Sequence, residues 1–129
     1  MRRVVVTGLG AITPLGSDVG VFFDALVAGR SGIRLLDEAW SDSSATRIAA
    51  QVDQDLDGTF PQLKLRSLDR VAKLALLAAR QAVAQAGVDL RGDPSERTGI
   101  YWGSGMGGAT TLETAYTELL VRHAPRLRP

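Results

Sequence analysis

The chain has 129 residues, enough for one domain with a sizeable core, and its formal net charge of +1 at pH 7 gives no reason to expect nucleic acid or an anionic membrane as its main partner. It has no cysteine and a single histidine, His123, which excludes a disulfide, a thiolate-bound zinc and a cysteine nucleophile within these residues. No apolar stretch approaches the length of a membrane span, and the first apolar run breaks at Thr7-Gly8, too early for a signal peptide. We therefore expect a cytoplasmic globular protein.

The first part of the chain predicts a strand, a loop and a helix. Residues 3–7 form a β-branched run ended by glycine, which is typical of a buried strand. A loop at residues 8–16 follows. We expect the next helix to begin at Ser17 or Asp18, which are good N-caps, and to end near residue 28 with Gly29 as its stop.

The middle of the chain predicts a loop, a short strand, a turn and a long helix. The polar residues 36–46 indicate a loop, residues 47–52 a strand and the acidic residues 53–58 a turn. Residues 67–86 favour a helix, because they include seven alanines, and Gly87 ends it. Such an alanine-rich helix is thin, so neighbouring segments can approach it closely.

The last part of the chain predicts a strand, a glycine-rich loop and a helix. Residues 98–102 indicate a strand that leads directly into Gly-Ser-Gly-Met-Gly-Gly at residues 103–108. Residues 110–123 indicate a final helix that stops before Pro125. This alternation of strands and helices predicts an α/β fold with layered helices and a mostly parallel sheet.

Gly8-x-Gly10 lies between a predicted strand and a predicted helix, as the dinucleotide-binding fingerprint requires. The third glycine of that fingerprint is replaced by Thr13, and Pro14 stands where the helix should already have begun. The predicted helix begins too late to point its N-terminus at a pyrophosphate. These features argue against a nucleotide site.

The loop at residues 103–108 contains four glycines, and no Lys-Ser/Thr pair follows it, which argues against a Walker phosphate loop. One interpretation is a plain turn from strand to helix that needs positive φ angles. The other is that bare backbone approaches a substrate or a partner strand closely, with Met106 as a movable apolar wall. Composition alone leaves both interpretations open.

The charged and titratable residues have local interpretations as well as functional ones. His123 near a helix end is interpreted as a surface residue in a favourable dipole contact. Arg66, Asp69 and Arg70 open the long helix and form either a solvated first turn with a local ion pair or part of a binding surface. Three arginines near the C-terminus form either a solvated tail or a contact for an acidic partner: Arg122, Arg126 and Arg128.

Four segments together resemble the β-ketoacyl-acyl-carrier-protein synthases, and the elongating type II condensing enzymes in particular. They are R-R-V-V-V-T-G-L-G with T-P-L-G in residues 2–16, A-L-V-A-G-R-S-G-I at 25–33, R-S-L-D-R at 66–70 and I-Y-W-G-S-G-M-G-G at 100–108. They occur in the family's order and spacing and cover nearly the whole chain.

The resemblance implies the thiolase fold, a layered αβαβα arrangement of two similar halves. Residues 1–129 would supply one incomplete domain, most of the first half. It further implies that an acyl group passes from carrier-protein phosphopantetheine to a cysteine and then condenses with decarboxylating malonyl-carrier protein. No cofactor is expected beyond the phosphopantetheine that carries the substrates, and no metal.

The family's cysteine and two histidines lie beyond the matched segments, so the resemblance implies no catalytic residue in this chain and no activity for the chain alone. The remainder of the synthase, from the same gene or from a partner subunit, would supply them. A homodimer or a heterodimer is expected, and acyl carrier protein is the expected partner.

The resemblance also assigns site residues. Met106 matches the apolar residue that gates the acyl pocket, and Gly105 and Gly107 would let this loop move. The residues near the family's carrier-protein-binding positions are Lys64, Arg66 and Arg126. That basic surface is incomplete, because three nearby positions that are often basic hold other residues: Leu63, Ser67 and Leu127.

Three functions are therefore considered. The first is part of a condensing enzyme of fatty acid or polyketide synthesis. The second is an inactive partner subunit of the chain-length-factor kind, which keeps the fold and lacks the cysteine. The third is a small module that binds an acidic protein through Arg66 and Arg126.

Overall fold

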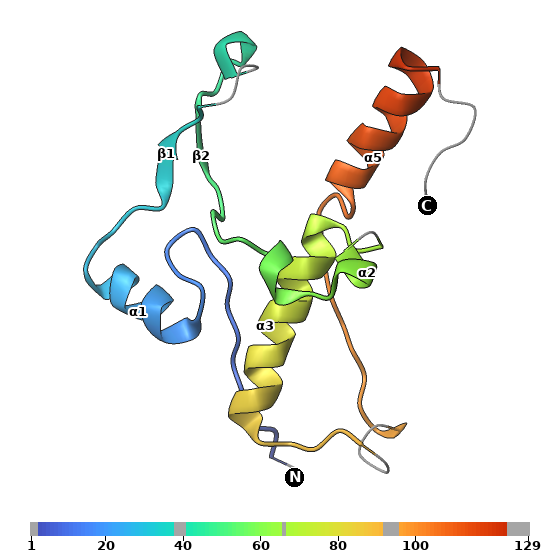
Figure 1. Ribbon diagram of the computed structural model, residues 1–129. Helices are drawn as coiled ribbons and strands as arrows, with labels where there is room; N and C mark the ends of the chain where they lie inside the picture. The colour runs from blue at the N-terminus through green and yellow to red at the C-terminus, as the bar shows by residue number, and fades with distance from the viewer. Residues whose placement is uncertain (1–2, 38–40, 66, 92–95, 124–129) are drawn as a thin grey trace. The chain divides into compact units, whose positions relative to one another are not determined.

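The structure is a computed structural model that describes residues 3–37, 41–65, 67–91 and 96–123 (Figure 1). The chain divides into two compact units. We call residues 1–54 and 77–88 the N-terminal unit, and residues 55–76 and 89–129 the C-terminal unit. The long helix α3 (Arg70–Ala86) contributes residues to both units, and each unit is described by itself.

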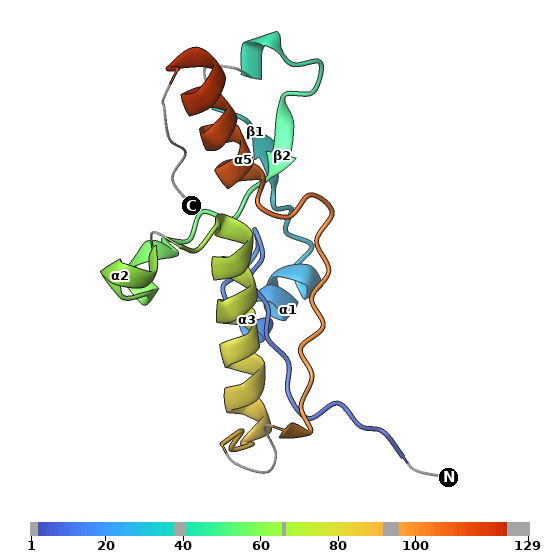
Figure 2. The same cartoon turned by 90° about the vertical axis from the view of Figure 1, so that its right-hand side faces the viewer.

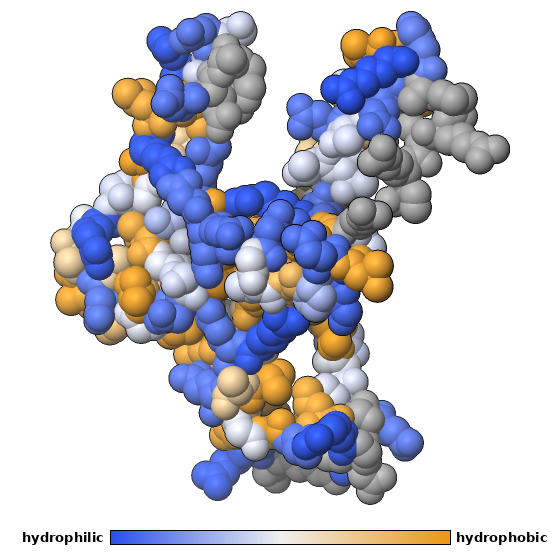
Figure 3. Space-filling model, in the orientation of Figure 1, coloured by the Kyte–Doolittle hydropathy of each residue, from blue (hydrophilic) through white to orange (hydrophobic). Residues whose placement is uncertain are grey.

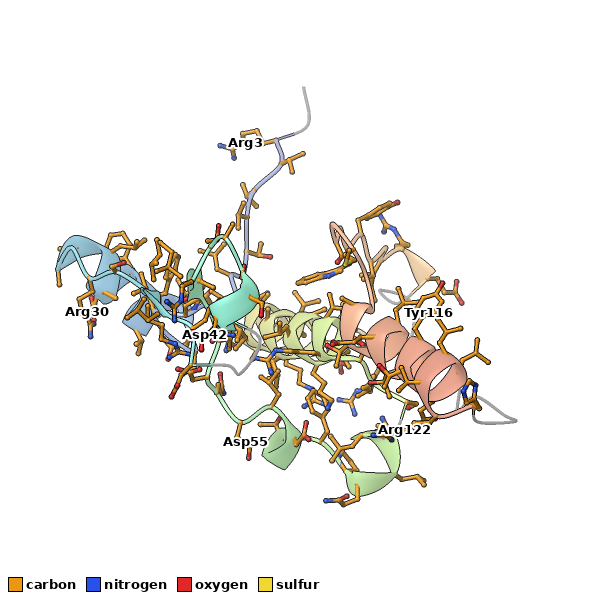
Figure 4. All side chains as sticks on the ribbon, turned by 90° about the horizontal axis from the view of Figure 1, so that it is seen from above. Arg3, Arg30, Asp42, Asp55, Tyr116 and Arg122 are labelled. Atoms are coloured by element: carbon orange, nitrogen blue, oxygen red, sulfur yellow. The ribbon has the colours of Figure 1, made fainter. Side chains whose placement is uncertain are left out.

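In the N-terminal unit, the first described residues run extended beside the C-terminal part of α3 (Figures 1 and 2). The predicted strand at residues 3–7 is wrong, because no described segment pairs with it and its valines are exposed. Figure 4 shows the Arg3 side chain projecting from this segment. In the residues that follow, backbone N–H groups donate to glutamine side chains of α3 instead of to a neighbouring strand. Gln85 Oε1 accepts from the Leu9 N–H at 2.6 Å, and Gln81 Oε1 accepts from the Ala11 N–H at 3.0 Å.

Gly8 and Gly10 let this extended segment lie directly on α3. A Cβ added to Gly8 would lie 2.9 Å from the carbonyl carbon of Ala82, and one added to Gly10 would lie 2.8 Å from that of Ala78. The expectation of a thin, closely approached helix is therefore confirmed. Backbone packing accounts for both glycines without a nucleotide.

Helix α1 (Val19–Val27) forms where the sequence predicts it. Asp18 is its N-cap, and the Asp18 carboxylate accepts from the Val21 N–H at 2.9 Å. Gly29 follows the helix with φ of +65°, a backbone conformation that favours glycine. Ala25 is fully buried and marks the packed face of α1.

Strands β1 (Ile33–Leu35) and β2 (Ile48–Ala50) form an antiparallel pair in which Ile33 lies opposite Ala50 and Leu35 opposite Ile48. β2 confirms the predicted strand, whereas β1 was not predicted. The prediction of a mostly parallel sheet is wrong for the described residues, whose one sheet is this hairpin. The two strands are neighbours in the chain, joined by a loop containing the short 3₁₀ turn η1 (Ser41–Ser43), and a local connection of this kind pairs strands antiparallel.

In the part of the C-terminal unit that the structure describes, short helical segments follow one another besides the start of α3. They are η2 (Asp57–Thr59), α2 (Gln62–Leu65), α5 (Ala109–Tyr116) and η3 (Thr117–Val121), a π-helical turn that directly continues α5. The predicted last helix is thus confirmed over most of its length.

The predicted strand at residues 98–102 is also wrong. This segment is extended but has no partner strand among the described residues, and Ile100 and Tyr101 are almost fully exposed. The apolar side chains buried in the described part of the chain are few: Ala25, Leu56, Phe60 and Leu77. Figure 3 shows apolar side chains on the surface among hydrophilic ones. No helix in the described ranges is long and apolar enough to cross a bilayer.

Candidate functional site

The glycine-rich loop at residues 103–108 leads into α5 and presents one large apolar side chain. Met106 is 77% exposed. The N–H of Gly107 donates to Ser104 Oγ at 2.9 Å, which closes the loop on itself. Gly107 has φ of +66°, a conformation that favours glycine. Gly105 has no such constraint, and a Cβ added there would meet no atom within 4 Å.

Asp69 joins the start of α3 to the first turn of α5. Asp69 Oδ1 accepts from the Val71 N–H at 3.1 Å, which caps α3. Asp69 Oδ2 accepts from the N–H of Thr111 at 2.9 Å and from Thr111 Oγ1 at 2.5 Å. We call this set of three hydrogen bonds the Asp69 clamp. It connects residues 42 positions apart in the chain.

These hydrogen bonds lower the pKa of the Asp69 carboxyl below its usual value. The largest cause is the Thr111 hydroxyl, which donates to the charged form. Burial opposes it, and the N–H groups of Val71 and Thr111 and the charge of Lys73 add to the lowering. Asp69 is therefore a carboxylate at neutral pH and can only accept hydrogen bonds.

A cavity of about 460 Å³ lies beside the Asp69 clamp. Its charged lining residues are Asp57, Asp69, Arg70, Lys73 and Glu118. Lys73 Nζ lies 2.6 Å from Asp57 Oδ1, so this lysine is already paired with the opposite wall. The described residues contain no group of three or more His, Cys, Asp or Glu side chains that could hold a metal ion.

The predicted carrier-protein-binding residues are described only in part. Lys64 lies in α2 with an exposed side chain, and its carbonyl accepts from both the N–H and the hydroxyl of Ser67 at 3.1 Å. Arg66 and Arg126 lie outside the described residues. Arg122 follows η3 and Tyr116 lies on α5, and both side chains project from this helical segment (Figure 4). The role of Lys64, Arg66 and Arg126 as a carrier-protein surface stays a prediction.

The sequence interpretation missed the Asp69 clamp. It left Asp69 either in a solvated first turn with a local ion pair or in a binding surface, and did not foresee that the carboxylate accepts from Val71 and Thr111. One indication was present: an aspartate immediately before a helix and a threonine in the first turn of another helix are both typical of helix N-termini. Nothing in the sequence pattern indicated that these two ends meet.

A family model described as "Beta-ketoacyl synthase, N-terminal domain" matches residues 1–127. The chain belongs to the β-ketoacyl synthase family. The family resemblance found in the four sequence segments is thereby confirmed.

Relatives agree with this family. The 3-oxoacyl-(acyl-carrier-protein) synthase 2 of Coxiella burnetii is 36% identical over 129 residues, which cover 99% of this chain and 31% of that protein. A crystal structure of a β-ketoacyl synthase from Burkholderia phymatum is 34% identical, with a TM-score of 0.73 over 96% of this chain and 31% of its own. The ishigamide ketosynthase/chain length factor is 26% identical, also with a TM-score of 0.73, over 99% of this chain and 32% of its own.

The folds of these structures confirm the expected thiolase-like fold, present here in part. The chain spans about a third of the length of the relatives that it matches.

Proposed function

We propose that this chain is the N-terminal part of a β-ketoacyl-acyl-carrier-protein synthase, an acyltransferase of fatty acid or polyketide synthesis. Its family membership over residues 1–127 is the observation that carries the proposal. The chain has no cysteine and one histidine, so the nucleophile and both catalytic histidines would come from outside it, and the chain alone would be inactive.

The reaction would have two halves. First, a cysteine thiolate attacks the acyl thioester and expels the carrier-protein thiol, which forms an acyl-enzyme. Malonyl-carrier protein then loses carbon dioxide, and the resulting carbanion attacks the acyl carbonyl. This forms the new carbon–carbon bond and releases the cysteine thiolate and 3-oxoacyl-carrier protein. Histidines and backbone N–H groups would stabilise the negative charge that develops on the thioester oxygens.

In this scheme the described residues select and receive the acyl chain. Met106 is exposed at the tip of the glycine-rich loop and would form the movable end of the acyl pocket. Gly107, in its left-handed conformation, provides a pivot directly after it. Lys64, together with Arg66 and Arg126, would attract the acidic carrier protein that delivers the substrate.

The test uses the protein as it occurs in its native source, captured through a tag added at the gene to the N-terminus of this chain. The purified protein is incubated with acyl-carrier protein and malonyl-carrier protein, and the carrier-bound product is analysed by mass spectrometry. We expect 3-oxoacyl-carrier protein, and none when the malonyl substrate is omitted. A captured protein that neither forms this product nor becomes acylated would contradict the enzyme function.

A second candidate is an inactive partner subunit of the chain-length-factor kind, and the likeness to the ishigamide ketosynthase/chain length factor supports it. The same preparation distinguishes the two. If the polypeptide that contains this chain carries the acyl group on a cysteine, it is the catalytic subunit. If the acyl group is found only on a co-purified polypeptide, this chain belongs to the inactive partner.

A further inference from the structure

We propose that Asp69 is a positioning residue that fixes the C-terminal end of the glycine-rich loop against the start of α3 and so limits the range of positions that Met106 can take. The consequence for acyl selectivity rests on the proposed function of Met106, whereas the positioning itself does not. Asp69 would not touch the substrate. It would act through Thr111 and the loop that precedes it.

The first argument is that the two oxygens of the Asp69 carboxylate accept hydrogen bonds from different helices. Oδ1 is used within its own helix, on the N–H of Val71. Oδ2 is directed at α5, where it accepts from both the N–H and the hydroxyl of Thr111. A helix cap needs only the first of these bonds, so the other two serve the connection between the elements.

The second argument is that the alternative partner of Asp69 is occupied. Lys73 lies four residues further along α3, the usual spacing for an ion pair on a helix. Its Nζ instead lies 2.6 Å from Asp57 Oδ1. The Asp69 carboxylate is therefore available to α5. The charge of Lys73 is the smallest of the causes that lower the pKa of Asp69.

The third argument is the closeness of the clamp to the loop. A Cβ added to Gly108 would lie 3.5 Å from Asp69 Cγ, so the loop ends in contact with this carboxylate. Gly108 is the N-cap of α5 and makes no side-chain cap bond, so Asp69 supplies the acceptor that the glycine lacks. On the other side of Met106, Ser104 Oγ accepts from the Gly107 N–H.

The loop is therefore held at its C-terminal end, while Met106 remains free to move. Rotation at Gly107 can carry the Met106 side chain without breaking the Asp69 clamp. Loss of the clamp would let the start of α5 and the whole loop shift together, so the range of Met106 positions would widen. A wider range would relax the discrimination between acyl chains of different length.

The test compares Asp69→Asn, Thr111→Val and Thr111→Ser in the native protein. Asparagine has one acceptor oxygen where aspartate has two, so it cannot accept from Val71 on one side and from Thr111 on the other, and it weakens the Asp69 clamp. Valine removes the hydroxyl, and serine restores it. Glu118→Gln is the matched control, because it changes a carboxylate of the same cavity that lies in η3 rather than at the start of α5.

Two readouts are taken. The first is amide hydrogen exchange of residues 107–112, and the second is the ratio of kcat/KM for the preferred acyl chain to that for one two carbons longer. We expect Asp69→Asn and Thr111→Val to speed the exchange about tenfold and to lower the ratio about threefold, and their combination to add little. Thr111→Ser and Glu118→Gln should resemble the unchanged protein in both.

Positioning is overturned if Asp69→Asn lowers only the thermal stability and leaves both the exchange and the ratio unchanged. Met106→Ala separates this failure from a failure of the proposed gate. If Met106→Ala leaves the ratio unchanged while Asp69→Asn speeds the exchange, the gate is wrong and the positioning of the loop is supported. If Met106→Ala changes the ratio and Asp69→Asn changes neither readout, the gate is supported and the positioning is wrong.

Discussion

The hydroxyl and N–H of Thr111 and the N–H of Val71 converge on one carboxylate, that of Asp69. All three donors favour its ionised form, and this outweighs the burial that opposes ionisation. A group whose pKa is lower in the folded state than in the unfolded state stabilises the fold only while it is ionised. The Asp69 clamp is therefore an acid-sensitive connection.

We predict that Asp69→Asn lowers the free energy of unfolding at pH 7 by about 1–2 kcal/mol, toward the lower end of the range for charged hydrogen bonds because the site is partly exposed. The stabilisation is fully present above the ordinary aspartate pKa of 3.8 and is lost as the pH falls through the lower folded-state value. The difference between the two proteins should then shrink below pH 3.8. Urea unfolding from pH 7 to pH 3 measures it.

Asp57 and Glu118 line the same cavity as further acidic side chains, and Arg70 and Lys73 line it as cations. Their effects are present in both proteins and largely cancel in the difference. A difference that stays constant down to pH 3 would contradict the role of the Asp69 charge.

At the scale of the elements, the helices could be predicted and most of the strands could not. Both ends of α1 lie within one residue of the predicted positions. Its N-cap Asp18 and the glycine that follows it, Gly29, are next to the helix in the sequence, so a local pattern identifies both ends. A strand needs hydrogen bonds from a second segment, and the local pattern does not say where that segment lies. Residues 3–7 and 98–102 have strand-like sequences and no partner strand in the described chain.

In the candidate site, too, some residues could be predicted from the sequence and others could not. Met106, Gly107 and Lys64 could be singled out because each lies within or beside a contiguous motif. The Asp69 clamp could not, because it joins two helix ends 42 residues apart. The pattern of capping residues identifies each end alone, and only the fold brings the two together.

Gly10→Ala tests the contact between the extended N-terminal segment and α3. The added Cβ would lie 2.8 Å from the carbonyl carbon of Ala78, and helix backbone cannot move aside as a side chain does. We expect a loss of about 1–3 kcal/mol, the usual cost of overpacking. Urea unfolding checks the prediction.

Gly103→Ala is the matched control for this substitution. A Cβ added to Gly103 would meet no atom within 4 Å, so the same chemical change should cost little. Equal stability of the two variants would mean that the segment does not lie on α3 in solution.

At the scale of the whole chain, the balance of buried and exposed apolar surface is unusual. The described residues bury only a few apolar side chains, while large ones stand exposed at Val4, Val6, Ile100 and Tyr101. These exposed residues belong to the two extended segments whose backbone has no partner strand. Extended segments that carry exposed apolar side chains and lie outside the described sheet are the kind of surface that associates with another chain.

We therefore predict that the 13.7 kDa chain, produced alone, associates with itself and binds a dye for exposed apolar surface. Light scattering after size exclusion gives its mass in solution.

Val5→Lys combined with Ile100→Lys should raise the fraction of monomer, because a charge in each extended segment opposes pairing of edges. Leu77→Lys is the contrasting variant, since it places a charge at a buried position and should unfold the chain instead. A monomer that melts cooperatively without these substitutions would show that the extended segments need no partner. If the proposed function is right, the rest of the synthase would then have to contact another surface of this chain.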